Sequence, residues 1–122
     1  MEMPYDELNK IIEQSLKPLL KTECEKLGIP QDFIKGIYPI FPKSFEYTSA
    51  CEPIVEGNKI EGVRIRIDCT ITKPGPALRD FWHEMRHAKD CYEGKNSSEI
   101  KAEFYSLKRR LQYLLWRKNI FK

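Results

Sequence analysis

Residues 83–87 read His-Glu-Met-Arg-His, and they contain both histidines of the 122-residue chain. Side chains four positions apart lie on one face of a helix, so two imidazoles at this spacing can bind one metal ion. Zinc favours imidazole nitrogen, and a catalytic zinc site takes three protein ligands and keeps a fourth position for water. The motif therefore requires a helix here and a second element that brings another ligand to it.

The carboxylate of Glu84 lies between the two histidines of the motif in sequence. At this position it cannot share their helical face fully, but it lies beside the ion and can take a proton from bound water. We therefore expect Glu84 to act as the general base and acid, with His83 and His87 as metal ligands. The other interpretation is a surface helix in which these side chains only form ion pairs with neighbours.

The third ligand must be a carboxylate or a thiolate, because no histidine is left. We expect it to be Glu99, in the first turn of a following helix that a loop around Gly94 would fold back onto the motif. Glu103, one turn later on the same face, would then contact the ring N–H of a ligating histidine from outside the ligand set. Two alternatives stay open: Glu103 is the ligand, or Glu99 only caps a helix whose N-cap is Asn96.

Hydrophobic periodicity predicts three helical regions, over residues 5–27, 77–92 and 97–118. Pro18 falls inside the first pattern and should kink or split that helix. The segment from Asp32 to Cys51 is rich in aromatic and β-branched residues and predicts one or two short strands. Strict alternation from Lys59 to Thr70, after a turn at residues 56–58, predicts a half-buried strand. The pattern predicts a single α+β domain covering residues 1–122.

The composition is that of a globular protein, with 41% hydrophobic and 32% charged residues. The net charge of +3 is too small to predict nucleic-acid binding by itself, and no apolar run predicts a transmembrane segment. We expect a cytoplasmic protein whose cysteines are buried reduced thiols, with disulfides of the kind that hyperthermophiles keep as the alternative. The cysteines are Cys24, Cys51, Cys69 and Cys91, and Cys91 and the neighbouring Asp90 are expected to pack beside the ligands rather than to bind the ion.

The HExxH motif followed by a glutamate pair on the next helix resembles the gluzincin metallopeptidases, and the small size resembles the minigluzincins. The resemblance covers mainly residues 76–110, and the wider group usually has Asp where this chain has Glu103. It implies a zincin-like minimal catalytic domain of a thermophilic prokaryote: an N-terminal helix, a small mainly antiparallel sheet, an active-site helix and a C-terminal glutamate helix. It also implies zinc bound by His83, His87 and Glu99, and endopeptidase activity that uses Glu84.

The strand at residues 62–70 fits the family's substrate-binding edge strand, to which a peptide could add through main-chain hydrogen bonds around Arg64, Ile65 and Arg66. No third histidine exists to stabilise an oxyanion. Arg110, seven positions after Glu103, is a candidate for that role, and Tyr105 and Tyr113 are further ones.

The segment from Lys108 to Lys122 has six basic and no acidic residues, interleaved with large apolar ones. That is more apolar surface than a free helix should expose. The resemblance implies that residues 112–122 are a latency or swapped tail, which predicts weak peptidase activity and a homodimer through the C-terminal helix. A second interpretation is an HExxH regulatory or protein-binding module, and a third gives the tail a membrane-surface or nucleic-acid contact, although the partners we expect are peptide or protein substrates.

Overall fold

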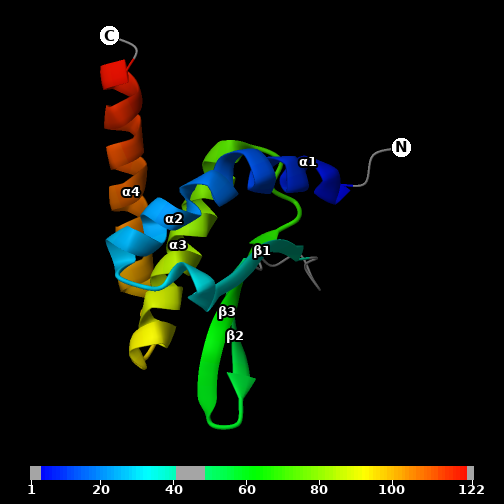
Figure 1. Cartoon of the computed structure of the whole chain (residues 1–122). Helices are drawn as coiled ribbons and strands as arrows, with labels where there is room; N and C mark the ends of the chain where they lie inside the picture. Colours follow the sequence, from blue (N-terminus) through cyan, green and yellow to red (C-terminus); the bar gives the residue numbers. More distant parts are fainter. Residues whose placement is uncertain (1–3, 41–48, 121–122) are drawn as a thin grey trace.

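The structure of the chain is a computed structural model that describes the backbone of residues 4–40 and 49–120 and the side chains of residues 6–40 and 49–116. Its fold is α+β: helices pack on one face of a three-stranded mixed sheet (Figure 1). The helical layer begins with α1 (Pro4–Ile11), η1 (Ile12–Leu16) and α2 (Lys17–Leu27). A short 3-10 turn, η2 (Gln31–Phe33), leads from α2 into the sheet.

The first predicted helix is interrupted just before Pro18. Residues 12–16 form one π-helical turn, in which the N–H of Lys17 donates to the carbonyl of Ile12, and α2 then begins with Pro18 in its first turn. A proline inside a helix lacks one donor and its ring meets the carbonyl four residues earlier, whereas the first turn of a helix tolerates it. The break is therefore the predicted split. Gly28, in the left-handed conformation at φ 72°, ends α2.

The sheet consists of β1 (Ile34–Ile40), β2 (Ala50–Glu56) and β3 (Lys59–Asp68), in the order β1-β3-β2. β1 runs parallel to β3, and β2 is antiparallel to it through a hairpin turn at Gly57 and Asn58. The prediction of a mainly antiparallel sheet with β3 as its edge was wrong, because β3 is paired on both sides. Alternating burial shows that one face of a strand is covered, but it does not tell how many neighbours the strand has. Among the described strands, β1 and β2 form the two edges of the sheet, and β2 contacts α3.

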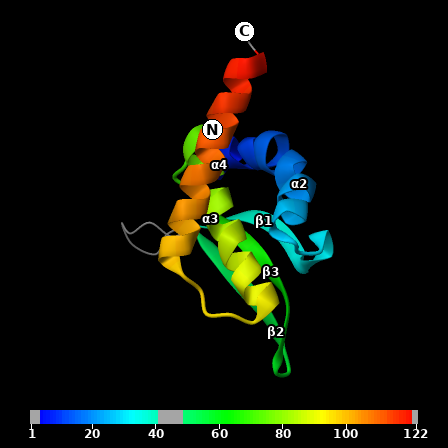
Figure 2. The same ribbon diagram turned by 90° about the vertical axis from the view of Figure 1, so that its left-hand side faces the viewer.

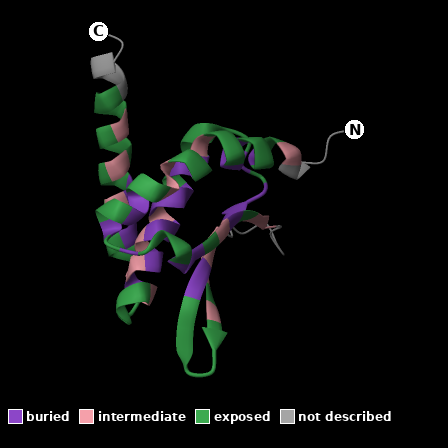
Figure 3. Cartoon of the chain, in the orientation of Figure 1, coloured by how far each residue is buried: buried purple, intermediate pink, exposed green. Residues whose placement is uncertain are grey.

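The motif helix is α3 (Pro74–Glu93), which crosses the covered face of β3 and contacts β2. Phe81 and Met85 of α3 are fully buried against Val63, Ile65 and Ile67 of β3, so the centre of the core lies between these two elements (Figure 3). Gly94, at φ 69°, ends α3 in the same way that Gly28 ends α2. The core therefore fixes the face of α3 that carries the motif.

The last helix, α4 (Glu99–Ile120), lies beside α3 at its start and extends beyond the rest of the molecule at its end (Figures 1 and 2). The N–H of Lys101 donates to Ser98 Oγ at 3.3 Å, so Ser98 caps this helix, and the expectation of Asn96 as N-cap was wrong. Of the predicted latency tail, residues 121–122 and the side chains of residues 117–120 lie outside the part of the chain that the structure describes. No helix in the described part of the chain combines the length and the hydropathy that crossing a lipid bilayer requires.

Candidate metal centre

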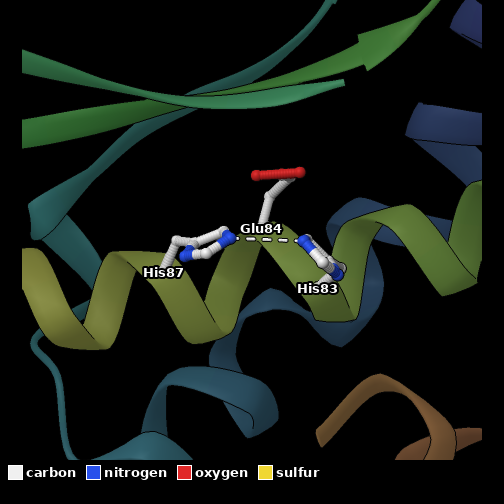
Figure 4. A group of neighbouring side chains, drawn as sticks. All are labelled: His83, Glu84 and His87. Carbon is white, nitrogen blue, oxygen red and sulfur yellow. Dashed lines mark hydrogen bonds between the residues drawn. The ribbon is translucent and has the colours of Figure 1, made fainter. Parts of the chain in front are cut away.

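The two histidines of α3 and the first glutamate of α4 meet at one point. The Nε2 atoms of His83 and His87 lie 3.2 Å apart, and their rings are turned toward each other (Figure 4). One carboxylate oxygen of Glu99 lies 3.0 Å from Nε2 of His83, and the other lies 3.0 Å from Nε2 of His87. Ligands bound tetrahedrally to zinc at about 2.0–2.1 Å are separated by roughly 3.3 Å. The three side chains therefore have nearly the mutual spacing of a zinc ligand set.

Two glutamates are within reach of the histidines, and their surroundings separate their roles. The ligand atoms of His83, Glu84 and His87 all lie within 4.8 Å of one another. However, Glu84 is buried, points toward the strands and accepts a hydrogen bond from the backbone N–H of Cys51 (Figure 4). Glu99 is 77% exposed and contacts both Nε2 atoms directly. The geometry thus fits Glu99 as the third ligand and leaves Glu84 beside the position where an ion would bind.

Glu103 supports His83 from the far side of its ring. Glu103 Oε1 lies 2.7 Å from Nδ1 of His83, while Nε2 of the same ring faces Glu99. A carboxylate beside Nδ1 favours the tautomer that leaves Nε2 free for a metal. The Nδ1 atoms of both histidines are buried, and neither makes a hydrogen bond to a described residue. Glu103 thus lies next to His83, as expected, but without the geometry of the hydrogen bond that the sequence predicted.

Burial and neighbouring charges shift the titration of the buried motif residues. Burial, with the nearby charges of Glu99 and Asp80, raises the pKa of Glu84 to about 8, against the opposing effect of the Cys51 N–H. Burial lowers the pKa of His87, although Glu99 opposes this shift. His87 is therefore held as the neutral imidazole, which is the form that binds metals. Glu84 is held where it can both accept and return a proton near neutral pH.

A cleft of about 610 Å³ surrounds these groups, between α3, the start of α4 and the start of β2. Asp80 lies at one end of it, and Ser49 Oγ donates to Asp80 Oδ2 at 2.5 Å while accepting from the N–H of Asp68 at 2.8 Å. Burial, followed by the charge of Glu103, raises the pKa of Asp80 to about 7. Ser49 thus connects the chain just before β2 to both α3 and β3, and holds β2 over the cleft.

Several residues that line the cleft were not predicted for the site, and several predicted residues lie elsewhere. The additional lining residues are Ser49, Ala50, Cys51, Arg79, Asp80 and Ser97, and Cys91, which was expected beside the ligands, also lines the cleft. Asp80 could have been found, because it is one helical turn before Glu84. Ser49 and Cys51 reach the cleft because of the way β2 pairs with β3, and no local sequence pattern predicts that pairing.

The three predicted transition-state stabilisers do not line the cleft. Arg110 lines a separate groove with Trp82 and Tyr113. Seven residues along a helix amount to about 10.5 Å, so Arg110 lies two turns beyond Glu103 and about three turns beyond Glu99. The hydroxyl of Tyr105 donates to the buried carboxylate of Glu23, and Tyr113 packs against Trp82. Arg79 is the described cation that does line the cleft.

The predicted substrate residues of β3 lie inside the sheet. Ile65 is fully buried under α3, while Arg64 lies on the opposite face and pairs with Glu52 at 3.0 Å. Arg66 stacks over Tyr38 on that opposite face. These residues therefore cannot offer a free strand edge to a peptide.

No protein-family model matches this chain, and no curated protein and no solved structure matches it either.

Proposed function

We propose that this protein is a zinc-dependent endopeptidase whose metal ligands are His83, His87 and Glu99. The observation that carries the proposal is the convergence of two imidazole nitrogens and one carboxylate at 3.0–3.2 Å, beside a buried glutamate. The set of two nitrogens and one oxygen suits zinc and leaves a coordination position open. The similarity of the motif and its spacing to the minigluzincins supports the same activity.

Glu84 would move the protons of the reaction. Zinc, when bound, lowers the pKa of a water molecule and polarises a peptide carbonyl. Glu84 accepts the proton of the attacking water and returns it to the amine that leaves, so no covalent intermediate with the chain is required. The hydrogen bond from the Cys51 N–H orients its carboxylate. Arg79, which lines the cleft and pairs with Asp80 at 3.5 Å, is the described cation that would face developing negative charge there.

The strand that would hold a peptide substrate is β2 rather than β3. Because the N–H of Cys51 points to Glu84, the backbone at Cys51 and at Pro53, two residues later, faces away from β3. Pro53 has no N–H, but because its backbone faces away from β3 the sheet loses no hydrogen bond. The missing N–H also limits pairing of another strand with the part of β2 that is farther from the histidines. Because the Cys51 N–H is bonded to Glu84 and Pro53 has none, a peptide would bind residues 51–53 of β2 by donating its N–H groups to the outward carbonyls of Cys51 and Pro53.

The exposed face of α4 supports the proposal that the C-terminal segment controls access to the site. Large apolar side chains recur at three- and four-residue steps and are at least half exposed; they are Ile100, Phe104, Leu107, Leu111, Leu114 and Leu115, and the adjacent Trp116 is exposed as well. A stripe of this kind normally packs against another surface. We propose that it pairs with a second copy of the chain and keeps the peptidase latent.

Latency and pairing can be tested together on the full-length chain. Light scattering should report a dimer, and replacement of Leu107 and Leu111 by Gln should give a folded monomer with higher peptidase activity. Removal of the residues after Gln112 should also raise activity. A wild-type monomer, or monomeric variants that stay folded with unchanged activity, would contradict this part of the proposal.

The metal site is tested first by metal content. Purified protein loaded with zinc and freed of excess should retain about one zinc per chain by mass spectrometry. His83→Ala should abolish retention and Glu99→Ala should weaken it, whereas the control Glu93→Ala, an exposed glutamate at the end of α3, should retain zinc. A wild-type chain that retains no zinc would overturn the proposal.

The alternative function, an HExxH regulatory or binding module, is separated from the enzyme by Glu84→Gln. This variant should bind zinc as the wild type does but fail to cleave a fluorescently labelled unfolded protein. If wild type and variant differ in neither cleavage nor any other readout while both hold zinc, the peptidase proposal fails and the binding module remains.

A further inference from the structure

Two thiols lie close to each other in the cleft. The side chains of Cys51, on β2, and Cys91, on α3, are half-buried, and each thiol affects the pKa of the other. Both line the cleft. The other two cysteines, Cys24 and Cys69, are buried in the core and line no part of the cleft.

The positions of the two thiols follow from the fold. Cys91 is one helical turn after His87 and therefore continues the face of α3 that carries the motif. Cys51 pairs with the fully buried Ile65 of β3, and directly paired residues point to the same face of a sheet, which here is the face that α3 covers. The pair thus brings together the edge strand and the motif helix.

We propose that Cys51 and Cys91 are a reversible disulfide site that joins β2 to α3. The oxidant would be a small-molecule disulfide such as oxidised glutathione. The thiolate of one cysteine attacks that disulfide, forming a mixed disulfide and releasing one thiol. The second cysteine then attacks the protein-bound sulfur, forms the Cys51–Cys91 bond and releases the second thiol, so that two protein thiols are oxidised and one small disulfide is reduced.

The bond would have a structural consequence, because β2 is held by hydrogen bonds to β3 on one side only among the described strands. A disulfide would fix the separation between this edge strand and α3, and it would close a loop of 40 residues (91 minus 51). Burial raises the pKa of both thiols, so they stay protonated at neutral pH and the exchange is slow. The site should therefore be tested at equilibrium, after long incubation.

The experiment uses the full chain in graded mixtures of reduced and oxidised glutathione, followed by alkylation, intact mass measurement and peptide mapping. We expect two cysteines to become protected from alkylation, with a single cross-link between the peptides of Cys51 and Cys91. The thermal midpoint should rise on the order of 10 °C, and dithiothreitol should reverse both changes.

Cys51→Ser and Cys91→Ser should each abolish the cross-link, and Cys24→Ala is the matched control that should retain it. Two results would overturn the proposal in a chain whose circular dichroism shows it to be folded: only mixed disulfides with glutathione, or cross-links that involve Cys24 or Cys69. The readout needs neither zinc nor peptidase activity, so its failure would be distinct from failure of the proposed function.

Discussion

One buried carboxylate, that of Glu23, connects α4 to α2. Glu23 of α2 is fully buried, accepts hydrogen bonds from the hydroxyl of Tyr105 and from Nε of Arg109 at 3.1 Å, and lies 3.1 Å from Nη2 of the same arginine. Arg109 also stacks over the ring of Trp82, with its side chain only 15% exposed. Burial, together with the hydrogen bond to Glu23, raises the pKa of Tyr105. We therefore predict that Glu23→Ala is strongly destabilising.

The magnitude follows from what the substitution leaves behind. Removing one partner of a buried ion pair costs about 3–5 kcal/mol, because the other charge remains buried without compensation. For a domain with a free energy of unfolding of about 5–15 kcal/mol, this is a large share, and it corresponds to a decrease of roughly 10–20 °C in the thermal midpoint. By contrast, Glu13→Ala, which breaks an exposed ion pair with Lys17 in the same helical region, should change stability by less than about 1 kcal/mol.

The assay is urea unfolding followed by circular dichroism, with a double-mutant cycle between Glu23→Ala and Arg109→Met. Methionine keeps the apolar stem of the arginine and removes its charge. Each single variant leaves the other charged group buried without its partner. The double variant should therefore lose less free energy of unfolding than the two single variants lose together, by at least about 1 kcal/mol. Additive effects, or a cost of Glu23→Ala no greater than that of Glu13→Ala, would refute the reasoning.

Three further predictions concern the site and the elements that hold it. Glu103→Ala should weaken zinc affinity by about 10- to 100-fold by titration calorimetry, because Nδ1 of His83 loses its carboxylate, while Glu103→Gln should weaken it less. Phe81→Ala should destabilise the chain by about 3–5 kcal/mol in urea, since the ring is fully buried under the sheet. Gly94→Ala should cost about 1 kcal/mol by thermal unfolding, because its φ of 69° suits glycine and disfavours alanine.

The local part of the site could be predicted from the sequence because helix geometry determines it. The spacing of His83, Glu84 and His87 needs only a helix, and the hydrophobic periodicity predicted that helix correctly. Glu99 and Glu103 needed one further assumption, a tight return after Gly94, and the left-handed glycine with the Ser98 cap provides it. Each of these features acts within a few residues of the chain.

The strand order could not be predicted in the same way. The alternation in β3 shows which side chains face α3, but both a central strand and an edge strand with one covered face produce that pattern. The order β1-β3-β2 instead depends on pairing between Ile34 and Val63 and between Cys51 and Ile65, which are distant in sequence. The position of the proposed substrate strand, and with it the proximity of Cys51 and Cys91, therefore depends on the three-dimensional structure.

The proposed zinc site and the buried Glu23 cluster should be linked thermodynamically, because both join α4 to the rest of the fold. Zinc would connect Glu99 of α4 to the histidines of α3, while Glu23 connects α2 to Tyr105 and Arg109 further along α4. A ligand that binds only the docked arrangement stabilises it by about 2.7 kcal/mol at 100 times its dissociation constant. Saturating zinc should therefore restore part of the stability that Glu23→Ala removes, and by reciprocity the same variant should bind zinc more weakly. Zinc affinity that is identical in wild type and Glu23→Ala would show that the first turns of α4 are positioned without the cluster.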